Sequence, residues 1–157
     1  MKLLYVCTHN ACRSILAEVI THQLLGDRVT VRSAGSAPAG RIHPLTLDFL
    51  EQRGYNTTGL AIESFDDVRD FDPDIVITVC DRAAAEACPA WLGPAARVHW
   101  GLPDPSHSEG DEQAKLQAFE AVMQTLASRL AALQKHDLEA LQPPELAEVM
   151  QSMDTLD

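Results

Sequence analysis

Hydrophobic positions along the chain follow two spacings, one typical of strands and the other typical of helices. Short, nearly continuous apolar runs favour strands buried in a parallel sheet, whereas apolar residues three or four positions apart favour a helix with one buried face. The predicted strands are Lys2–Val6, Val29–Ser33, Ile75–Val79 and Arg97–Trp100. The predicted helices begin at Ser14 and at Pro44, with a short helix over Asp66–Phe71, a helical turn over Ala83–Ala87 and a long helix over Leu116–Leu133. Strands that alternate with helices predict an α/β fold whose parallel sheet is covered on both faces.

The end of the chain differs in character from the rest. Residues 137–157 hold six acidic side chains and no Lys or Arg, and Pro143 and Pro144 interrupt them. Leu146, Val149 and Met150 have the spacing of one short amphipathic helix. We therefore predict one domain over residues 1–136 and a solvated acidic extension over residues 137–157, to which we assign no chemistry.

Composition narrows the classes of function. A chain of 157 residues fits one domain, and its net charge of −11 argues against nucleic acid or an anionic membrane as a partner. No apolar run approaches the roughly 20 residues that span a bilayer, and Leu3–Cys7 is too short for a signal peptide. We therefore expect a cytoplasmic protein, in which the four cysteines favour catalysis or metal binding over structural disulfides.

The segment from Cys7 to Ser14 joins the first predicted strand to the first predicted helix. Unpaired N–H groups and the positive end of the helix dipole make such a loop a site for anions, and they stabilise a thiolate at Cys7. Arg13 can grip two oxygens of a tetrahedral oxyanion through its planar fork. The predicted oxyanion loop comprises Thr8, His9, Asn10, Ala11, Cys12, Arg13 and Ser14, of which Asn10 and Ser14 can brace it. Cys7 is thus the predicted nucleophile beneath a bound oxyanion.

Two further candidates follow other predicted strands. Asp104 lies between two prolines and can protonate the oxygen that leaves a tetrahedral centre; the alternative is an aspartate that only forms a turn. Cys80 ends the third predicted strand. Ligand sites of open α/β sheets lie at the carboxyl ends of the strands, and neighbouring strands are about 4.8 Å apart. We therefore expect Cys7, Cys80 and Asp104 at one edge of the sheet.

In the Cys7–Ser14 loop and at Asp104-Pro105 the chain resembles the low-molecular-weight tyrosine phosphatase superfamily, over about Met1 to Leu133. This resemblance implies a four-stranded sheet in the order 2-1-3-4 and an acid at Asp104. With Cys80, Cys88 and the run His99–Gly101, the chain resembles the thioredoxin-coupled arsenate reductases within that superfamily. The phosphatases usually place an aromatic residue after Asp-Pro, whereas this chain continues with Ser106 and His107.

The resemblance implies an enzyme of arsenic detoxification that reduces arsenate to arsenite. Cys7, Cys80 and Cys88 would form a relay of thiols and disulfides that thioredoxin regenerates, with no tightly bound cofactor and with phosphate or sulfate as competing oxyanions. Three alternatives stay open: a phosphatase of phosphotyrosine or small phosphate esters, a reductase that uses glutathione with glutaredoxin or mycothiol, and an oxyanion-sensing protein. An oxyanion sensor requires no general acid, so Asp104 argues against that alternative. An arsenate reductase of this kind is also compatible with a weak phosphatase side activity.

The chain departs from the family pattern at two places. Seven residues separate Cys80 from Cys88, where the family commonly has six. Members with a potassium site use an asparagine, a glutamate, a serine and an aspartate; Asn10, Glu18 and Ser33 match the first three, but Phe65 occupies the fourth position. We therefore expect an altered or absent potassium site. We expect no zinc site at Cys80 and Cys88, because paired ligands at short spacing are lacking, and Cys12 is interpreted as a packing residue or a back-up thiol.

Overall fold

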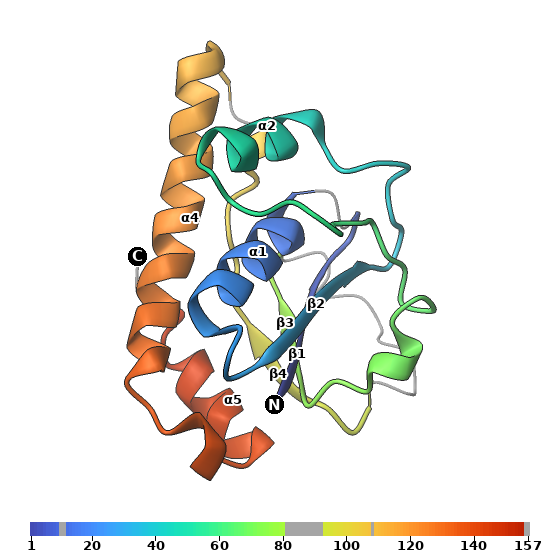
Figure 1. Cartoon of the computed structure of the whole chain (residues 1–157), viewed down its shortest axis with the longest axis vertical. Helices are drawn as coiled ribbons and strands as arrows, with labels where there is room; N and C mark the ends of the chain where they lie inside the picture. The colour runs from blue at the N-terminus through green and yellow to red at the C-terminus, as the bar shows by residue number, and fades with distance from the viewer. Residues whose placement is uncertain (10–11, 81–92, 108, 156–157) are drawn as a thin grey trace.

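The sheet at the centre of the molecule confirms the predicted architecture. A computed structural model describes residues 1–9, 12–80, 93–107 and 109–155. Its four strands are β1 (Lys2–Cys7), β2 (Thr30–Gly35), β3 (Ile75–Thr78) and β4 (Ala96–His99). All neighbouring pairs run parallel, and the order across the sheet is β2-β1-β3-β4 (Figure 1). The predicted α/β class and the order 2-1-3-4 are both confirmed.

Helices lie where the apolar spacing predicts them. The α-helices are α1 (Arg13–Leu25), α2 (Pro44–Gln52), α4 (Glu112–Gln134) and α5 (Pro143–Gln151), and short 3-10 turns cover Arg69–Phe71, Pro105–His107 and Leu138–Ala140. The predicted helix over Asp66–Phe71 is thus only a 3-10 turn at its carboxyl end. The predicted turn over Ala83–Ala87 lies outside the described residues.

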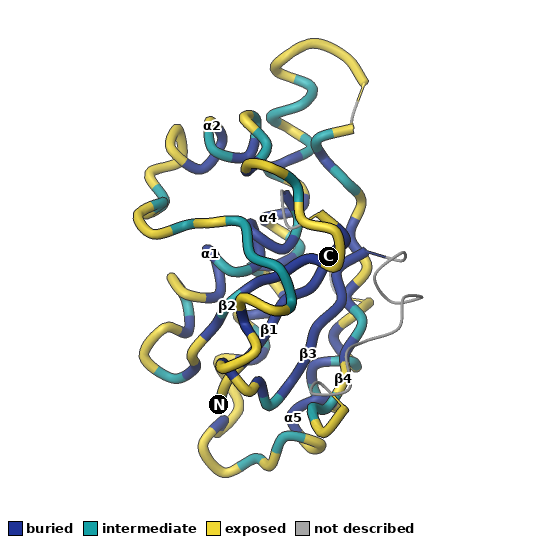
Figure 2. The backbone as a smooth tube through the Cα atoms, turned by 90° about the vertical axis from the view of Figure 1, so that its right-hand side faces the viewer, coloured by how far each residue is buried: buried dark blue, intermediate teal, exposed yellow. Residues whose placement is uncertain are grey.

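The core is built on the two middle strands, which are buried along nearly their whole length (Figure 2). α1 packs against β1, β2 and α4. The apolar stripe of α4 faces inward, and the ring of Phe119 stacks on the ring of Phe49 in α2, with 5.4 Å between the ring centroids. Tyr5 of β1 is fully buried, so its hydroxyl pairs with Thr21 of α1 at 2.8 Å, and burial raises the pKa of Tyr5 above its usual value. This polar contact ties α1 to the sheet.

The register of the strands brings distant segments to one edge. Val6 of β1 lies opposite Thr78 of β3, and the Val79 N–H donates to the Val6 carbonyl at 3.0 Å. Two residues further along each strand, Thr8 and Cys80 therefore leave the sheet side by side. Because all four strands point the same way, the segment after β4 also leaves at this edge.

The predicted solvated extension is wrong for one face of this segment, although the acidic side chains of its described residues are exposed. Leu138, Leu146, Ala147, Met150 and Met153 are buried, because the short amphipathic helix, now α5, packs its apolar face against β4. The division of the chain at residue 136 stays a prediction.

Polar groups of α5 also bind the sheet. Gln151 accepts from the His99 N–H at 2.9 Å through Oε1 and donates to the His99 carbonyl at 3.0 Å through Nε2. The Trp100 indole N–H donates to the carbonyl of Met150 at 2.7 Å, and the Arg129 guanidinium lies over the Trp100 ring. Buried polar groups require such partners, and these hydrogen bonds hold the apolar face of the segment against the hydrophobic core.

No helix within the described part of the chain is both long enough and apolar enough to cross a membrane.

Candidate active site

A cavity of about 220 Å³ lies at the carboxyl edge of the sheet and is lined by three of the predicted catalytic residues. Cys7 reaches it from the end of β1, Arg13 from the start of α1, and Asp104 from the segment after β4. Its lining consists of Cys7, Thr8, His9, Cys12, Arg13, Ala39, His43, Asp104, Ser106 and His107. A thiol, a guanidinium and a carboxyl group from distant parts of the chain therefore share one small space.

Cys7 has the surroundings of a reactive thiol. Its side chain is buried, with 4% of its surface exposed, and its sulfur lies 2.9 Å from Oγ of Ser14 in the first turn of α1. A thiolate can only accept, so the Ser14 hydroxyl donates to it when Cys7 is ionised. The positive end of α1 adds a second stabilising influence on that negative charge.

The oxyanion loop is braced by the segment after β2. The N–H of Ala37 donates to the carbonyl of Thr8, and the N–H of Ala39 donates to the carbonyl of His9, both at 2.9 Å. His9 is exposed, and its Nδ1 lies 3.1 Å from the Ala37 carbonyl oxygen. Asn10 and Ala11 lie outside the described residues.

Cys12 differs from Cys7 although both line the cavity. It is 6% exposed, and burial raises its pKa to about 12, while a hydrogen bond with Thr46 of α2 opposes that shift. Cys12 therefore remains a neutral thiol at physiological pH and packs between α1 and α2. Thr46 was not singled out by the sequence, because a polar residue on an amphipathic helix gives no sign that it faces inward.

Arg13 and Asp104 contact each other across the mouth of the cavity. Nη2 of Arg13 lies 3.6 Å from Oδ2 of Asp104, and Nη1 donates to the Leu102 carbonyl at 3.0 Å. Each of the two charged side chains is 22% exposed, so water and a bound ion can reach both. An incoming oxyanion can thus replace Asp104 as the partner of one guanidinium edge.

Ser106 and His107 are site residues whose roles the sequence did not indicate. Oδ1 of Asp104 accepts from the N–H of Ser106 at 3.0 Å and from its hydroxyl at 2.6 Å, and Nδ1 of His107 lies 3.6 Å from Oδ2 of Asp104. An aspartate that forms a turn commonly accepts a hydrogen bond from the backbone N–H two residues later in the chain, as Asp104 does from Ser106. Asp104 therefore forms the turn and also lines the cavity, so the two interpretations of this residue are compatible.

Cys80 lies just behind the oxyanion loop. It is 3% exposed, and its sulfur lies 3.8 Å from Oγ1 of Thr8, which itself lines the cavity. Cys7, Cys12 and Cys80 are all free thiols. Cys88 lies outside the described residues. A third buried thiol, besides Cys7 and Cys12, thus lies one side chain away from the candidate active site.

Comparison with known proteins identifies the family. The sequence model of the low molecular weight phosphotyrosine protein phosphatases matches residues 2–143. The chain belongs to this family. Among its curated relatives, proteins from Halalkalibacterium halodurans and Bacillus subtilis, each named arsenate reductase, are 33% identical over 130 residues, which is 82% of this chain and 92% of each relative.

Solved structures of the phosphatase family share the fold. A thioredoxin-dependent arsenate reductase from Corynebacterium glutamicum superposes with a TM-score of 0.64 at 30% identity, over 85% of this chain but only 62% of that longer chain. A low molecular weight phosphotyrosine phosphatase from Vibrio cholerae superposes with a TM-score of 0.70 at 19% identity, over 90% of this chain and 99% of that one, which shows the fold alone. Reductases and phosphatases therefore share this arrangement of strands and helices.

Of the potassium ligands that the resemblance to the arsenate reductases implies, the structure describes Glu18 and Ser33. Oγ of Ser33 donates directly to Oε1 of Glu18 at 2.5 Å, and burial raises the pKa of Glu18 above its usual value. The side chain of Phe65 has no oxygen, and Asn10 lies outside the described residues. The described residues do not fit a full ligand set, and no group of three His, Cys, Asp or Glu side chains suited to a metal occurs among them. No step of the chemistry below depends on an ion.

Proposed function

We propose that this protein reduces arsenate to arsenite, with thioredoxin as the electron donor. One observation carries the proposal: the buried thiol of Cys80 lies beside Thr8 of the oxyanion loop, one side chain away from the cavity that holds Cys7. A phosphatase frees its thiol by hydrolysis and has no use for this second sulfur. The arsenate reductases that resemble the chain support the same activity.

The first step forms a bond between Cys7 and arsenic. Loop amides and Arg13 bind arsenate, the Cys7 thiolate attacks the arsenic, and Asp104 protonates the oxygen that leaves as water. Ser14 stabilises the thiolate before the attack, at 2.9 Å from its sulfur. The product is an arsenate thioester on Cys7, with arsenic still pentavalent.

The second step reduces arsenic. The Cys80 thiolate attacks the Cys7 sulfur, a disulfide forms, the S–As bond breaks, and its electron pair leaves with arsenic as trivalent arsenite. The Thr8 hydroxyl lies 3.8 Å from the Cys80 sulfur and is placed to donate to that thiolate. Two electrons thus pass from two thiols to one arsenic atom.

The last steps restore Cys7. The Cys88 thiolate attacks Cys80 and releases Cys7, and the dithiol of thioredoxin then reduces the Cys80–Cys88 disulfide. A disulfide requires α-carbons within about 7 Å, so the segment between these two cysteines must let them meet. The sequence of that segment includes Ala83 to Ala85, whose side chains are small.

Replacing Cys88→Ser tests the relay. The variant should release about one arsenite per enzyme and stop as a Cys7–Cys80 disulfide, which peptide mass spectrometry identifies. Cys80→Ser is the matched comparison, because it should bind arsenate yet release no arsenite. Continuous turnover of Cys88→Ser with thioredoxin would show that Cys88 takes no part.

A phosphatase is the second candidate, because Cys7, Arg13 and Asp104 share a cavity that suits a phosphate ester equally well. Turnover of an aryl phosphate, measured beside arsenate-dependent NADPH oxidation, separates the two activities. Supplying thioredoxin, glutathione with glutaredoxin, or mycothiol in turn identifies the reductant. Faster turnover of the aryl phosphate than of arsenate would replace the proposal with the phosphatase.

A further inference from the structure

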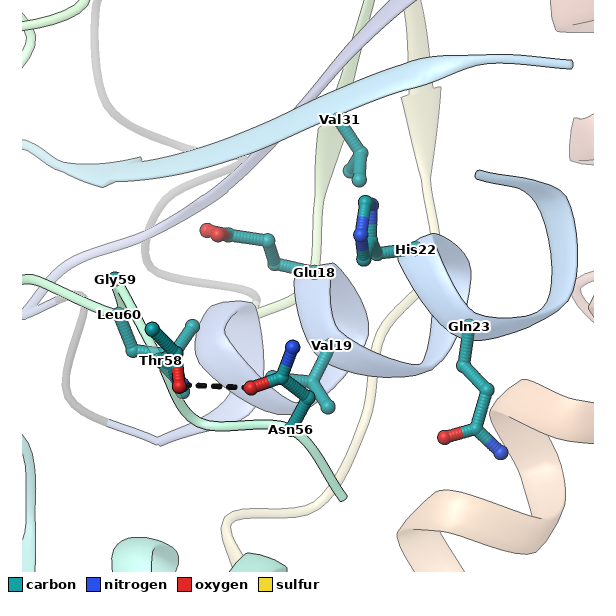
Figure 3. A pocket seen from close by; sticks show the side chains of 9 residues that line it. All are labelled: Glu18, Val19, His22, Gln23, Val31, Asn56, Thr58, Gly59 and Leu60. Atoms are coloured by element: carbon teal, nitrogen blue, oxygen red, sulfur yellow. Dashed lines mark hydrogen bonds between the residues drawn. The ribbon is translucent and has the colours of Figure 1, made fainter. Parts of the chain in front are cut away.

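A second cavity, of about 340 Å³, lies between α1, β2 and the segment 56–60. Its described lining shares no residue with the candidate active site. Figure 3 shows Glu18 and His22 projecting from α1 toward β2, while Asn56 and Thr58 face them from the opposite wall. The volume is within the range of about 300–1,000 Å³ that is typical of sites for small molecules.

The charge of this cavity favours a cation. Glu18 is its one carboxylate, and no Lys or Arg occurs among the described lining residues. The nearby guanidinium of Arg32 is already paired with Glu63 at 2.7 Å. Glu18 accepts from the Ser33 hydroxyl through Oε1, and a carboxylate has about four lone-pair sites, so it can accept from a ligand as well.

The rest of the wall favours a ligand with an apolar part. Val19 of α1, Val31 of β2 and Leu60 present aliphatic groups to the same space. A bare inorganic ion gains nothing from such surfaces, whereas an alkyl chain is removed from water there. The side chain of Asn56 is held in place because its Oδ1 accepts from the Thr58 N–H at 3.0 Å. The carboxylate of Glu18 and the aliphatic side chains together favour a cation that carries an alkyl group.

We propose that this cavity binds a small alkylammonium ion, with Glu18 as its counterion and the aliphatic wall against its carbon chain. Two sources carry this chemistry, a free aliphatic amine and the lysine side chain of another protein. The inference does not depend on the proposed function, because it involves none of the residues that line the candidate active site.

Titration with n-butylammonium chloride, followed by amide NMR shifts, tests the proposal. We expect saturable shifts in α1 and in segment 56–60, with binding at least tenfold weaker in Glu18→Gln. Glu51→Gln is the matched control, because it removes the same charge from an exposed position on α2 and should leave binding unchanged. Leu60→Ala should weaken butylammonium but not methylammonium, and the same spectra report whether each variant is folded.

Three results would overturn the proposal. They are the absence of saturable shifts, equal shifts from potassium chloride or from n-butanol, and equal loss of binding in Glu51→Gln. Lysine capped at both ends, titrated beside butylammonium, separates the two sources. Tighter binding of capped lysine assigns the cavity to a partner's side chain, and tighter binding of butylammonium assigns it to a free amine.

Discussion

Ser14→Ala should slow the chemistry of Cys7 without disturbing the fold. The hydroxyl of Ser14 is fully buried and lies 2.9 Å from the Cys7 sulfur, so water cannot readily take its place. Loss of this donor should disfavour the thiolate relative to the thiol. We expect Cys7 to react more slowly with a disulfide reagent under conditions in which the thiol form predominates over the thiolate.

The size of the effect follows from two opposing contributions. A hydrogen bond to a charged group contributes about 1.5–3 kcal/mol, which changes the ratio of thiolate to thiol by about 10-fold to 150-fold. The less stabilised thiolate is also more nucleophilic, with a Brønsted coefficient of about 0.4–0.5, which cancels nearly half of that change on a logarithmic scale. The rate of reaction with a disulfide reagent should therefore fall by about 4-fold to 20-fold.

Reaction with dithiodipyridine at acidic pH measures this rate, and peptide mass spectrometry shows that Cys7 is the cysteine modified. Thr21→Ala is the matched control, since Thr21 is an equally buried hydroxyl on α1 that pairs with Tyr5 instead. It should lower stability and leave the rate at Cys7 unchanged. An unchanged rate in Ser14→Ala, or an equal fall in Thr21→Ala, would refute the reasoning.

Three further outcomes are expected. Asp104→Asn should slow single-turnover formation of the arsenic–sulfur bond by about 10²–10⁴-fold while phosphate still protects Cys7 from alkylation; an unchanged rate would reduce Asp104 to a turn residue. Leu146→Ala should cost about 2–5 kcal/mol in urea unfolding, because Leu146 is fully buried, whereas exposed Glu148→Ala should change little. The pKa of Glu18 is raised in the folded state, so the contribution of Glu18 to stability falls as pH rises above about 4.5. The melting temperature of Glu18→Gln should therefore increase relative to that of the wild type between pH 4.5 and 8. A difference that stays constant over this range would contradict the prediction.

Much of the fold could be predicted because its signals are local. Strand β3 is a run of β-branched residues, and the apolar stripe of α4 recurs at helical spacing from Leu116 to Leu133, so spacing alone indicates both. The extension at 137–157 was misjudged because its charge suggested exposure, whereas burial depends on the complementary face of β4, which spacing along the chain does not show.

The candidate site was predictable where one short segment carries it. The segment between the first strand and the first helix carries Cys7, Arg13 and Ser14 within eight residues. A loop this short predicts that the three side chains lie close together. The contacts of Ser106 with Asp104 and of Thr8 with Cys80 depend on turn geometry and on register between strands. Neither leaves a periodic signal in the sequence.

The side chain of Gln151 binds the outer edge of β4, where a further strand of the sheet would otherwise pair. Its amide binds both the N–H and the carbonyl of His99, the same two groups that a further strand beside β4 would use. An exposed edge strand is a template for pairing with another chain and hence for aggregation. Gln151 occupies the outward hydrogen-bonding groups of β4 at His99, and α5 covers the strand. The C-terminal segment thereby prevents a strand of another molecule from pairing with this edge of the sheet.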